Sequence, residues 1–556
     1  MRPRDVRASV RDGGVEVWWS SSSVVSAHRV QLVDLDRGAS ASDAILVKGT
    51  HAVLDGSASG VWVDAIPGGR AVAIVGAGDQ GGTGGAWQIF APWDFRAGQL
   101  SAAFARLAPT ERLAVLLVNS GGRDGAQAEV IVDGASEIPE QPAALSSAPP
   151  APSPGLHEMV RARESALALE RPAAAEPLPS GARRSFCVVR GLDFSRHVRK
   201  PATLAISTVH AEMYVDDDDL EEYQVDVLAS LTDAFEQRVW SAITSTFGMP
   251  TDVDGNGKLT VFITHELGTH LNGGWLIGYF GNADLVRARD DSADCSSGGS
   301  NHGEIVYLND AGNGSANGYS AADLFLGVYP ATLAHEMQHL LNFAHRCVER
   351  SCEGAQETWI NEALSKVAED LAGYGWNAAS GRAEGAAYLR RAEGAAYLRR
   401  AEGELRGYDG RSLTRWEGDP IGNYQGVHSF LRLFTDRSGV ELLGRIARES
   451  SGVEGLEAML GLPLPMAMAE WATALLLSNE PGSPYSFSGS AWSPLHDRLR
   501  YLDTRAPGIV TLRQDGIAAV MSGTGLGGPA RVVVRSREEN APYVVVVRTS
   551  ATIPVR

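Results

Sequence analysis

The segment from residue 329 to 345, YPATLAHEMQHLLNFAH, constrains this chain more than any other. Pro330 suits the first turn of a helix. Apolar residues follow at helical spacing and can form a buried stripe: Leu333, Met337, Leu340 and Leu341. His335 and His339 are four positions apart, so a helix places both imidazoles on one face, where they can bind one metal ion. The segment therefore predicts a metal-binding helix.

Glu336 follows the first of these histidines and completes the pattern HExxH. Zinc lowers the pKa of a bound water to about 7, and a neighbouring carboxylate can take the proton as that water attacks a carbonyl. The alternative is a buried helix with two hydrogen-bonded histidines. Because the motif lies in an apolar helix and a third ligand is available downstream, zinc is favoured, with Glu336 as the general base.

One candidate for the third ligand is His345, which completes the metzincin spacing HExxHxxNxxH. Metzincins, however, need a glycine for the sharp turn at the position that Asn342 occupies here. They also need a methionine-containing turn soon afterwards, and no methionine occurs between Met337 and Met459. If His345 is not a ligand, it is a residue near the helix C-terminus that interacts with the helix dipole.

The other candidate is Glu362, in the sequence ETWINEALS on the next predicted helix. A helical hairpin of this length can return its carboxylate to His335 and His339. Two histidines and one glutamate leave a fourth position open, which is the usual arrangement of a catalytic zinc site. We therefore predict that Glu362, rather than His345, is the third ligand.

The chain of 556 residues is too long for one hydrophobic core. Short alternating apolar runs predict an all-β, sandwich-like domain over residues 1–135. Residues 136–184 are rich in Pro, Ala and Ser and predict a linker. Mixed strand and helix patterns followed by helices predict an α+β catalytic domain over 185–482. Renewed β-like runs predict a small C-terminal β domain over 483–556.

Charge and hydropathy exclude several classes of partner. The formal net charge is −18, which disfavours binding to nucleic acid or to an anionic membrane. No apolar run reaches the roughly 18 residues of a membrane-spanning helix. The N-terminal segment also lacks the apolar core of a signal peptide. We expect either that the protein stays inside the cell or that a leader precedes Met1.

Two of the four cysteines, Cys347 and Cys352, enclose a short loop just beyond the HExxH helix. Their spacing favours a disulfide that closes the end of this helix, which implies an oxidising compartment. The alternative is a pair of free thiols.

The stretch DVDGNG resembles the beginning of a calcium-binding loop. Ile263 stands where an EF-hand has its bidentate glutamate, so a full EF-hand is excluded. A smaller calcium turn that uses Asp252, Asp254 and Asn256 is one interpretation. A turn rich in Asp and Gly, without an ion, is the other.

The combination of AHEMQHLLNF, TWINEALS and NYQGVHSFLRLF resembles the hyicolysin-type neutral metallopeptidases, a gluzincin family of secreted bacterial enzymes. MYVDDDDL, FGMPTDVDGNGKLTVFIT and GEIVYLND match the same pattern, so the resemblance covers about residues 200–445. It implies a thermolysin-like α+β fold, zinc-dependent cleavage of protein or peptide substrates, and a secreted or cell-surface location. Carried onto this sequence, the ligands are His335, His339 and Glu362, and the base is Glu336.

The chain also departs from the related thermolysin-type pattern. Those enzymes have an aspartate four residues after the third ligand to orient a zinc histidine, and Lys366 stands there instead. Glu369 or Asp370 would have to take over this support. The resemblance further suggests Tyr424 as the hydroxyl that stabilises the oxyanion, with His428 as the second candidate. Without such a role, both residues would only pack beside the site.

Two other functions remain open. A gluzincin aminopeptidase needs acidic groups to hold the free amine of its substrate, and the strand before the zinc helix offers only Glu304 early on. A non-catalytic adhesion or binding protein could retain the scaffold. In that case the motif would be expected to degenerate, yet its histidines and glutamates are intact. The sequence therefore favours an endopeptidase.

Overall fold

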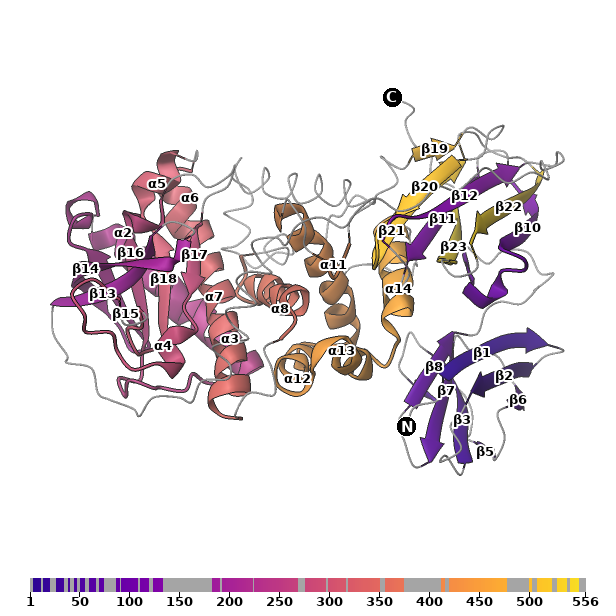
Figure 1. Cartoon of the computed structure of the whole chain (residues 1–556), viewed down its shortest axis with the longest axis horizontal. Helices are drawn as coiled ribbons and strands as arrows, with labels where there is room; N and C mark the ends of the chain where they lie inside the picture. Colours follow the sequence, from indigo (N-terminus) through magenta and orange to yellow (C-terminus); the bar gives the residue numbers. More distant parts are fainter. Residues whose placement is uncertain are drawn as a thin grey trace.

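The computed structural model describes residues 4–133, 183–374, 412–477 and 500–549, with shorter gaps inside each range. An α/β part lies at one end, helices follow in the middle, and β-sheets lie at the other end (Figure 1). The predicted linker over 136–184 lies outside the described residues, except for its last two, which begin a strand.

A mixed six-stranded sheet forms the α/β part, in the order β13-β14-β15-β16-β18-β17. The three strands β15, β16 and β18 are parallel to one another, and the other neighbouring pairs are antiparallel. The strands are β13 (Arg183–Arg190), β14 (Asp193–Ser207), β15 (Ala211–Asp216), β16 (Leu259–Thr264), β17 (Gly278–Phe280) and β18 (Ile305–Asn309). The mixed strand and helix pattern predicted for this region is present, with strands at FCVVRGL, KLTVFITHEL and GEIVYLND.

Both faces of this sheet are buried, as strand β16 illustrates. Val261 and Ile263 belong to the core that also contains the helices, whereas Phe262 belongs to a smaller cluster on the opposite face. Alternation of side chains along a strand produces this division. The helices of the larger core include α2 (Val225–Ala234), α3 (Trp240–Phe247) and the HExxH helix α7 (Tyr329–Phe343).

In the second half of this region, the described residues are mostly helical, as predicted. Its helices are α8 (Thr358–Leu371), α11 (Pro420–Ser438), α12 (Glu441–Glu449), α13 (Gly452–Leu460) and α14 (Leu464–Leu477). Three of them meet through aromatic rings. Phe430 of α11 makes edge contacts with Trp359 of α8 and with Trp471 of α14, at centroid distances of 6.0 Å each.

The C-terminal strands do not form a separate small domain, contrary to the expectation for residues 483–556. They pair with strands from residues 87–133 to form a four-stranded sheet, β10-β22-β12-β20, and a five-stranded sheet, β19-β21-β11-β23-β9. The earlier strands are β9 (Trp87–Phe90), β10 (Gln99–Leu107), β11 (Arg112–Asn119) and β12 (Ala126–Asp133). The later ones are β19 (Arg500–Leu502), β20 (Gly508–Leu512), β21 (Gly516–Ser522), β22 (Gly528–Ser536) and β23 (Tyr543–Thr549).

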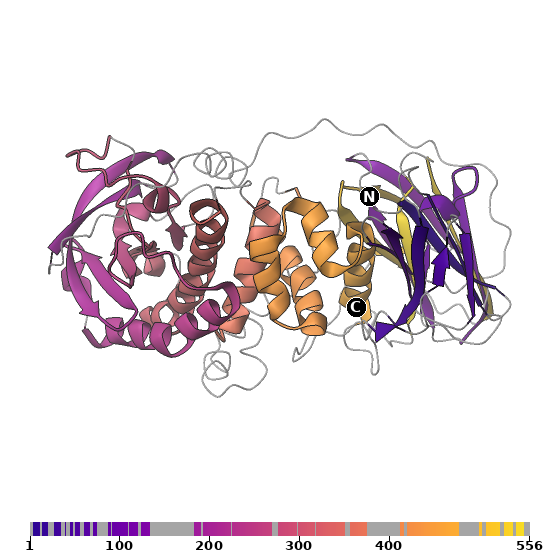
Figure 2. The ribbon, with the colours of Figure 1, turned by 90° about the horizontal axis from the view of Figure 1, so that it is seen from below.

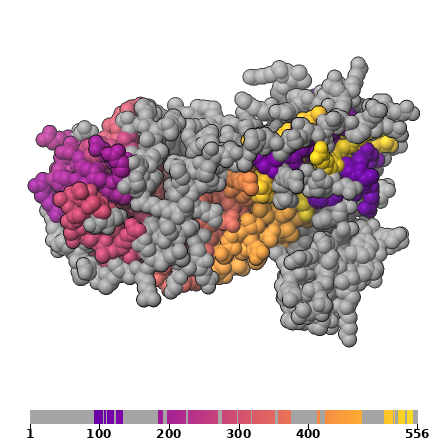
Figure 3. Space-filling view, viewed as in Figure 1, coloured from indigo at the N-terminus to yellow at the C-terminus, as the bar shows by residue number. Residues whose placement is uncertain are grey.

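This two-sheet unit also packs against the helices. In β11, Val115 and Leu117 face the interior between the sheets, whereas Leu116 and Val118 belong to the core that contains α14. Figures 1 and 2 show α14 lying along the five-stranded sheet. In space-filling view, the orange helical surface adjoins the indigo and yellow surface of this unit (Figure 3).

Residues 4–74 form further sheets, β1-β2-β6 and a second one that contains β4-β3-β7-β8. Their strands include β1 (Arg4–Arg11), β2 (Gly14–Ser20), β3 (Ala27–Asp34), β4 (Ala39–Ser40), β6 (His51–Asp55), β7 (Gly60–Ile66) and β8 (Arg70–Ile74). The predicted N-terminal β domain therefore divides. The strands of residues 4–74 pair with one another, whereas those of residues 87–133 pair with the C-terminal strands.

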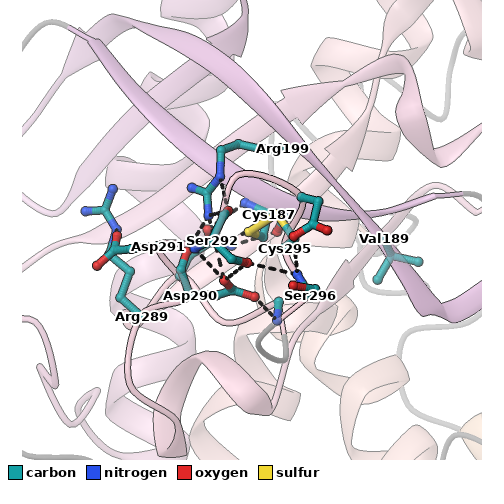
Figure 4. The surroundings of a disulfide bond; sticks show 12 residues. Cys187, Val189, Arg199, Arg289, Asp290, Asp291, Ser292, Cys295 and Ser296 are labelled. Atoms are coloured by element: carbon teal, nitrogen blue, oxygen red, sulfur yellow. Dashed lines mark hydrogen bonds and ion pairs between the residues drawn. A yellow bond between two sulfur atoms is a disulfide. The ribbon is translucent and has the colours of Figure 1, made fainter.

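A disulfide joins Cys187 of β13 to Cys295, across 108 positions of sequence (Figure 4). The loop that contains Cys295 is also held by Arg199 of β14, whose guanidinium donates to the backbone oxygens of Asp290 and Ser292. The sequence did not predict this pairing. Cys347 is disulfide-bonded as well. The remaining cysteine, Cys352, lies outside the described residues.

Candidate metal and catalytic site

Helices α7 and α8 pack against each other and bring together the three predicted ligands. The Oε2 atom of Glu362 lies 3.1 Å from Nε2 of His335 and 3.4 Å from Nε2 of His339. In a tetrahedral site with bonds of about 2.0–2.1 Å, neighbouring donor atoms are about 3.3 Å apart. Both the spacing and the donor types therefore fit zinc.

The two helices meet in this way because each buries an apolar face. Leu333, Met337, Leu340 and Leu341 of α7 are fully buried, as the sequence predicted. The opening residue of α7 is also anchored, because the Tyr329 hydroxyl donates to the backbone oxygen of Asn309 at the end of β18. These contacts leave the polar face of α7 turned toward α8.

Glu369 supports the first histidine from behind. Its Oε1 lies 2.9 Å from Nδ1 of His335, so the ring can donate there and present Nε2 to a metal. Lys366 donates to the other carboxylate oxygen of Glu369 at 2.6 Å. Of the two candidates for this support, the structure therefore brings Glu369 to the histidine, and Lys366 holds Glu369. Asp370 points to a different pair of residues.

Ser365 lies beside the second histidine. Its hydroxyl is 3.1 Å from Nδ1 and 3.2 Å from Nε2 of His339, and it donates to the side-chain oxygen of Gln338. Sequence reasoning missed Ser365. Its spacing of three residues from Glu362, which puts both on one side of a helix, was the available signal.

Glu336 is held by the edge strand of the sheet. The backbone N–H of Phe280 in β17 donates to Oε2 of Glu336 at 3.0 Å. This bond fixes one carboxylate oxygen and leaves Oε1 for another partner. No sequence pattern pointed to Phe280, because the contact uses only its backbone.

Tyr424 of α11 lies next to the metal group. Its ring packs edge-on against His335, with centroids 6.1 Å apart. Burial, together with the negative charges of Glu362, Glu336 and Glu369, raises the pKa of the Tyr424 hydroxyl well above its usual value. The hydroxyl therefore stays protonated and can donate a hydrogen bond.

His428, the second candidate for that role, faces away from the metal group. Its Nε2 lies 2.7 Å from the Oδ2 atom of Asp370, and Arg432 donates to the same oxygen at 2.6 Å. All three side chains are buried. His428 therefore contributes to a charged contact between α8 and α11.

His345 is not among the residues that the structure brings to the metal group. Its Nδ1 lies 2.9 Å from Oε2 of Glu349, one helical turn further on. Its Nε2 faces Gly248, where even a Cβ atom would lie only 2.6 Å away. His345 therefore packs against Glu349 and Gly248 and does not belong to the group formed by His335, His339 and Glu362.

The electrostatics of the metal group suit a cation. Burial lowers the pKa of His335, but Glu362 and Glu369 outweigh this effect and raise that pKa to about 10. Burial opposes ionisation of Glu362, yet the two histidines bring its pKa well below the usual value. The carboxylates around the two histidines therefore favour a positive charge at this place, which a bound metal ion can supply.

Two further groups in the described residues bring together possible ligands. Asp216, Asp219 and His265 form the first, in which Lys200 already neutralises Asp216 at 3.4 Å. Asp252, Asp254 and Glu304 form the second. Asn256, a candidate ligand in one of the two interpretations of this turn, donates to the carboxylate of Asp254, and its side-chain oxygen accepts the backbone N–H of Lys258.

Comparison with known proteins gives a distant match. No family model matches this sequence. The chain is 23% identical over 189 residues to the neutral metalloprotease ShpI of Staphylococcus hyicus. The aligned part is 34% of this chain and 40% of the relative, so the chain spans less than half of that protein's length. The similarity therefore points to metalloproteases as a class and carries no finer specificity.

Proposed function

We propose that this protein is a zinc-dependent endopeptidase of the hyicolysin type, with a thermolysin-like catalytic region. One observation carries the proposal: His335, His339 and Glu362 converge, with Oε2 of Glu362 3.1 Å and 3.4 Å from the two imidazole nitrogens, and Glu336 follows His335 on the same helix. The distant similarity to a neutral metalloprotease supports the same class. A helical scaffold alone would not need three ionisable side chains gathered in this way.

In the proposed reaction, His335, His339 and Glu362 would hold zinc, which when bound would supply Lewis acidity toward a water molecule and the scissile carbonyl. Glu336 accepts the proton of the attacking water through Oε1, while the Phe280 N–H holds its other oxygen. The carboxyl then delivers that proton to the departing amine. Tyr424 donates its hydroxyl to the carbonyl oxygen as negative charge develops there.

The structure favours this proposal over its two alternatives. An aminopeptidase needs an acidic group near the metal for the substrate amine, whereas Glu304 lies with Asp252 and Asp254 in a separate group. A non-catalytic binding protein would not need Glu369 and Lys366 aligned behind a zinc histidine. Protein or peptide chains are therefore the proposed substrates.

We further infer that the protein acts outside the cytoplasm, at the cell surface or after secretion. The disulfide between Cys187 and Cys295 supports this, because such bonds persist in oxidising compartments. Among the described residues, no helix is long and apolar enough to cross a bilayer.

We expect the protein to hydrolyse casein. This activity should be lost when zinc is removed with 1,10-phenanthroline and should return when zinc is added back. Cleavage of internal bonds should appear as peptides of varied length in mass spectra. Release of single N-terminal residues alone would instead identify an aminopeptidase. Failure to cleave any of a broad set of unfolded proteins and peptides, with zinc fully bound, would contradict the proposed function.

Replacing Tyr424 with Phe removes one hydroxyl and keeps the ring that packs against His335. We expect kcat to fall on the order of 10²-fold, with little change in KM, because the lost bond forms mainly in the transition state. Zinc content should not change. His428→Ala is the comparison variant. If it lowers kcat at full zinc occupancy and an unchanged melting temperature while Tyr424→Phe does not, the assignment is wrong.

A further inference from the structure

A cluster of three carboxylates lies at the opposite end of the parallel strands from Asp216 and Asn309. The loop between α3 and β16 carries Asp252 and Asp254, and Glu304 directly precedes β18. One carboxylate oxygen from each of these three residues lies within 4.8 Å of the others. Asp254 and Glu304 are each only 1% exposed, so two of the three carboxylates are removed from water.

The orientation of Glu304 points to a missing partner. Its Oε1 accepts the Thr251 hydroxyl and the Val253 N–H, both at 2.9 Å. These bonds turn the carboxylate toward the loop that carries the two aspartates. Its Oε2 is buried and has no hydrogen-bond partner. A buried carboxylate oxygen without a donor is costly, and a bound cation removes that cost.

The protein itself supplies little positive charge here. Arg184 influences Asp254 through its charge, but no Lys, Arg or His of the described residues forms an ion pair with any of the three carboxylates. Burial and the charge of Glu304 raise the pKa of Asp254 to about 6. The group therefore holds excess negative charge that an ion can neutralise.

We propose that Asp252, Asp254 and Glu304 bind a calcium ion. Calcium prefers carboxylate oxygens at about 2.3–2.6 Å, so two oxygens on opposite sides of the ion are up to about 5 Å apart. The ligand oxygens of the three residues lie within 4.8 Å of one another, which is inside this span. Magnesium requires a stricter octahedron and keeps several of its waters, so an all-protein cluster of carboxylates on a loop suits it less well. Glu304 thus takes the place that the sequence pattern suggested for Asn256.

Such an ion would fasten the loop to the central sheet. The backbone oxygen of Glu304 already accepts the Thr260 N–H at 2.8 Å, which ties β18 to β16. Strand β18 also pairs with β17, whose Phe280 holds Glu336. Calcium binding should therefore stabilise the sheet on which the proposed catalytic base depends.

The test is calcium-dependent stability of the full chain in the Glu336→Gln background, where self-digestion cannot interfere. After dialysis into zinc-containing, calcium-free buffer, we expect calcium to raise the melting temperature by about 5 °C or more above an equal concentration of magnesium. Glu304→Gln keeps the size of the side chain, and we expect it to abolish most of this rise. Its calcium affinity, measured by calorimetry, should fall at least about tenfold.

Asp252→Asn provides a second variant for the case that the buried Glu304→Gln protein does not fold, because Asp252 is exposed. Asp291→Asn is the control, since Asp291 is a loop aspartate with an 81% exposed side chain that pairs only with Arg289. It should respond to calcium like the parent. An unchanged calcium response in both test variants, or no response in the parent, would overturn the proposal. Neither measurement depends on peptidase activity.

Discussion

Glu336→Gln should lower kcat on the order of 10⁴-fold, the upper end of what a positioned base contributes, while the protein stays folded and keeps its zinc. The glutamine amide can still accept the Phe280 N–H through its oxygen. It cannot, however, take a proton from water at neutral pH. Burial already raises the pKa of the Glu336 carboxyl, as does the charge of Glu362. A neutral side chain should therefore leave stability unchanged or slightly increase it.

The matched control is Glu349→Gln, the same chemical change just after the same helix. Glu349 pairs with His345 and is 47% exposed, so its replacement should leave kcat within a few-fold of the parent. The assay needs three readouts for both variants: initial rates on a peptide substrate, zinc per chain and the melting temperature. If Glu336→Gln retains rates close to the parent with normal zinc content, another group accepts the proton and the proposed mechanism fails.

Local sequence patterns predicted most of the catalytic region. The period of apolar residues marked α7, and the spacing of His335 and His339 put both rings on one face of it. These inferences depend on residues within a few turns of one another, where helix geometry determines what can meet. Sequence patterns did not decide whether Glu369 or Asp370 supports His335. That choice depends on the rotation of α8 relative to α7, which is determined by packing between the helices.

Contacts between distant parts of the chain were harder to predict. The strand runs GIVTL and PYVVVVR were recognised, but their pairing with residues 112–133 crosses the whole α/β and helical region. Strand patterns indicate which face is buried and do not identify the partner strand. Glu304 was likewise considered only as part of its own strand, because nothing in the DVDGNG segment indicates that β18 lies beside it.

The second prediction with a large expected effect concerns Glu362, the proposed third zinc ligand. Glu362→Ala removes the carboxylate whose Oε2 lies 3.1 Å from His335 and 3.4 Å from His339. We expect zinc affinity to fall by more than the roughly 10–100-fold that follows loss of an outer-shell partner, and activity to be lost with the metal. His345→Ala should keep full zinc, because its ring pairs with Glu349 and faces Gly248. Zinc per chain after dialysis against a weak chelator distinguishes the two variants.

A third variant separates loss of the ligand from loss of structure. Glu369→Gln should weaken zinc binding by roughly 10–100-fold, since the amide still reaches His335 but no longer carries a charge. The expected order of zinc affinity is therefore the parent and His345→Ala, then Glu369→Gln, then Glu362→Ala. Full zinc in Glu362→Ala together with loss in His345→Ala would reverse the choice of ligand. It would also mean that His345 leaves its contacts with Glu349 and Gly248 in the metal-bound protein.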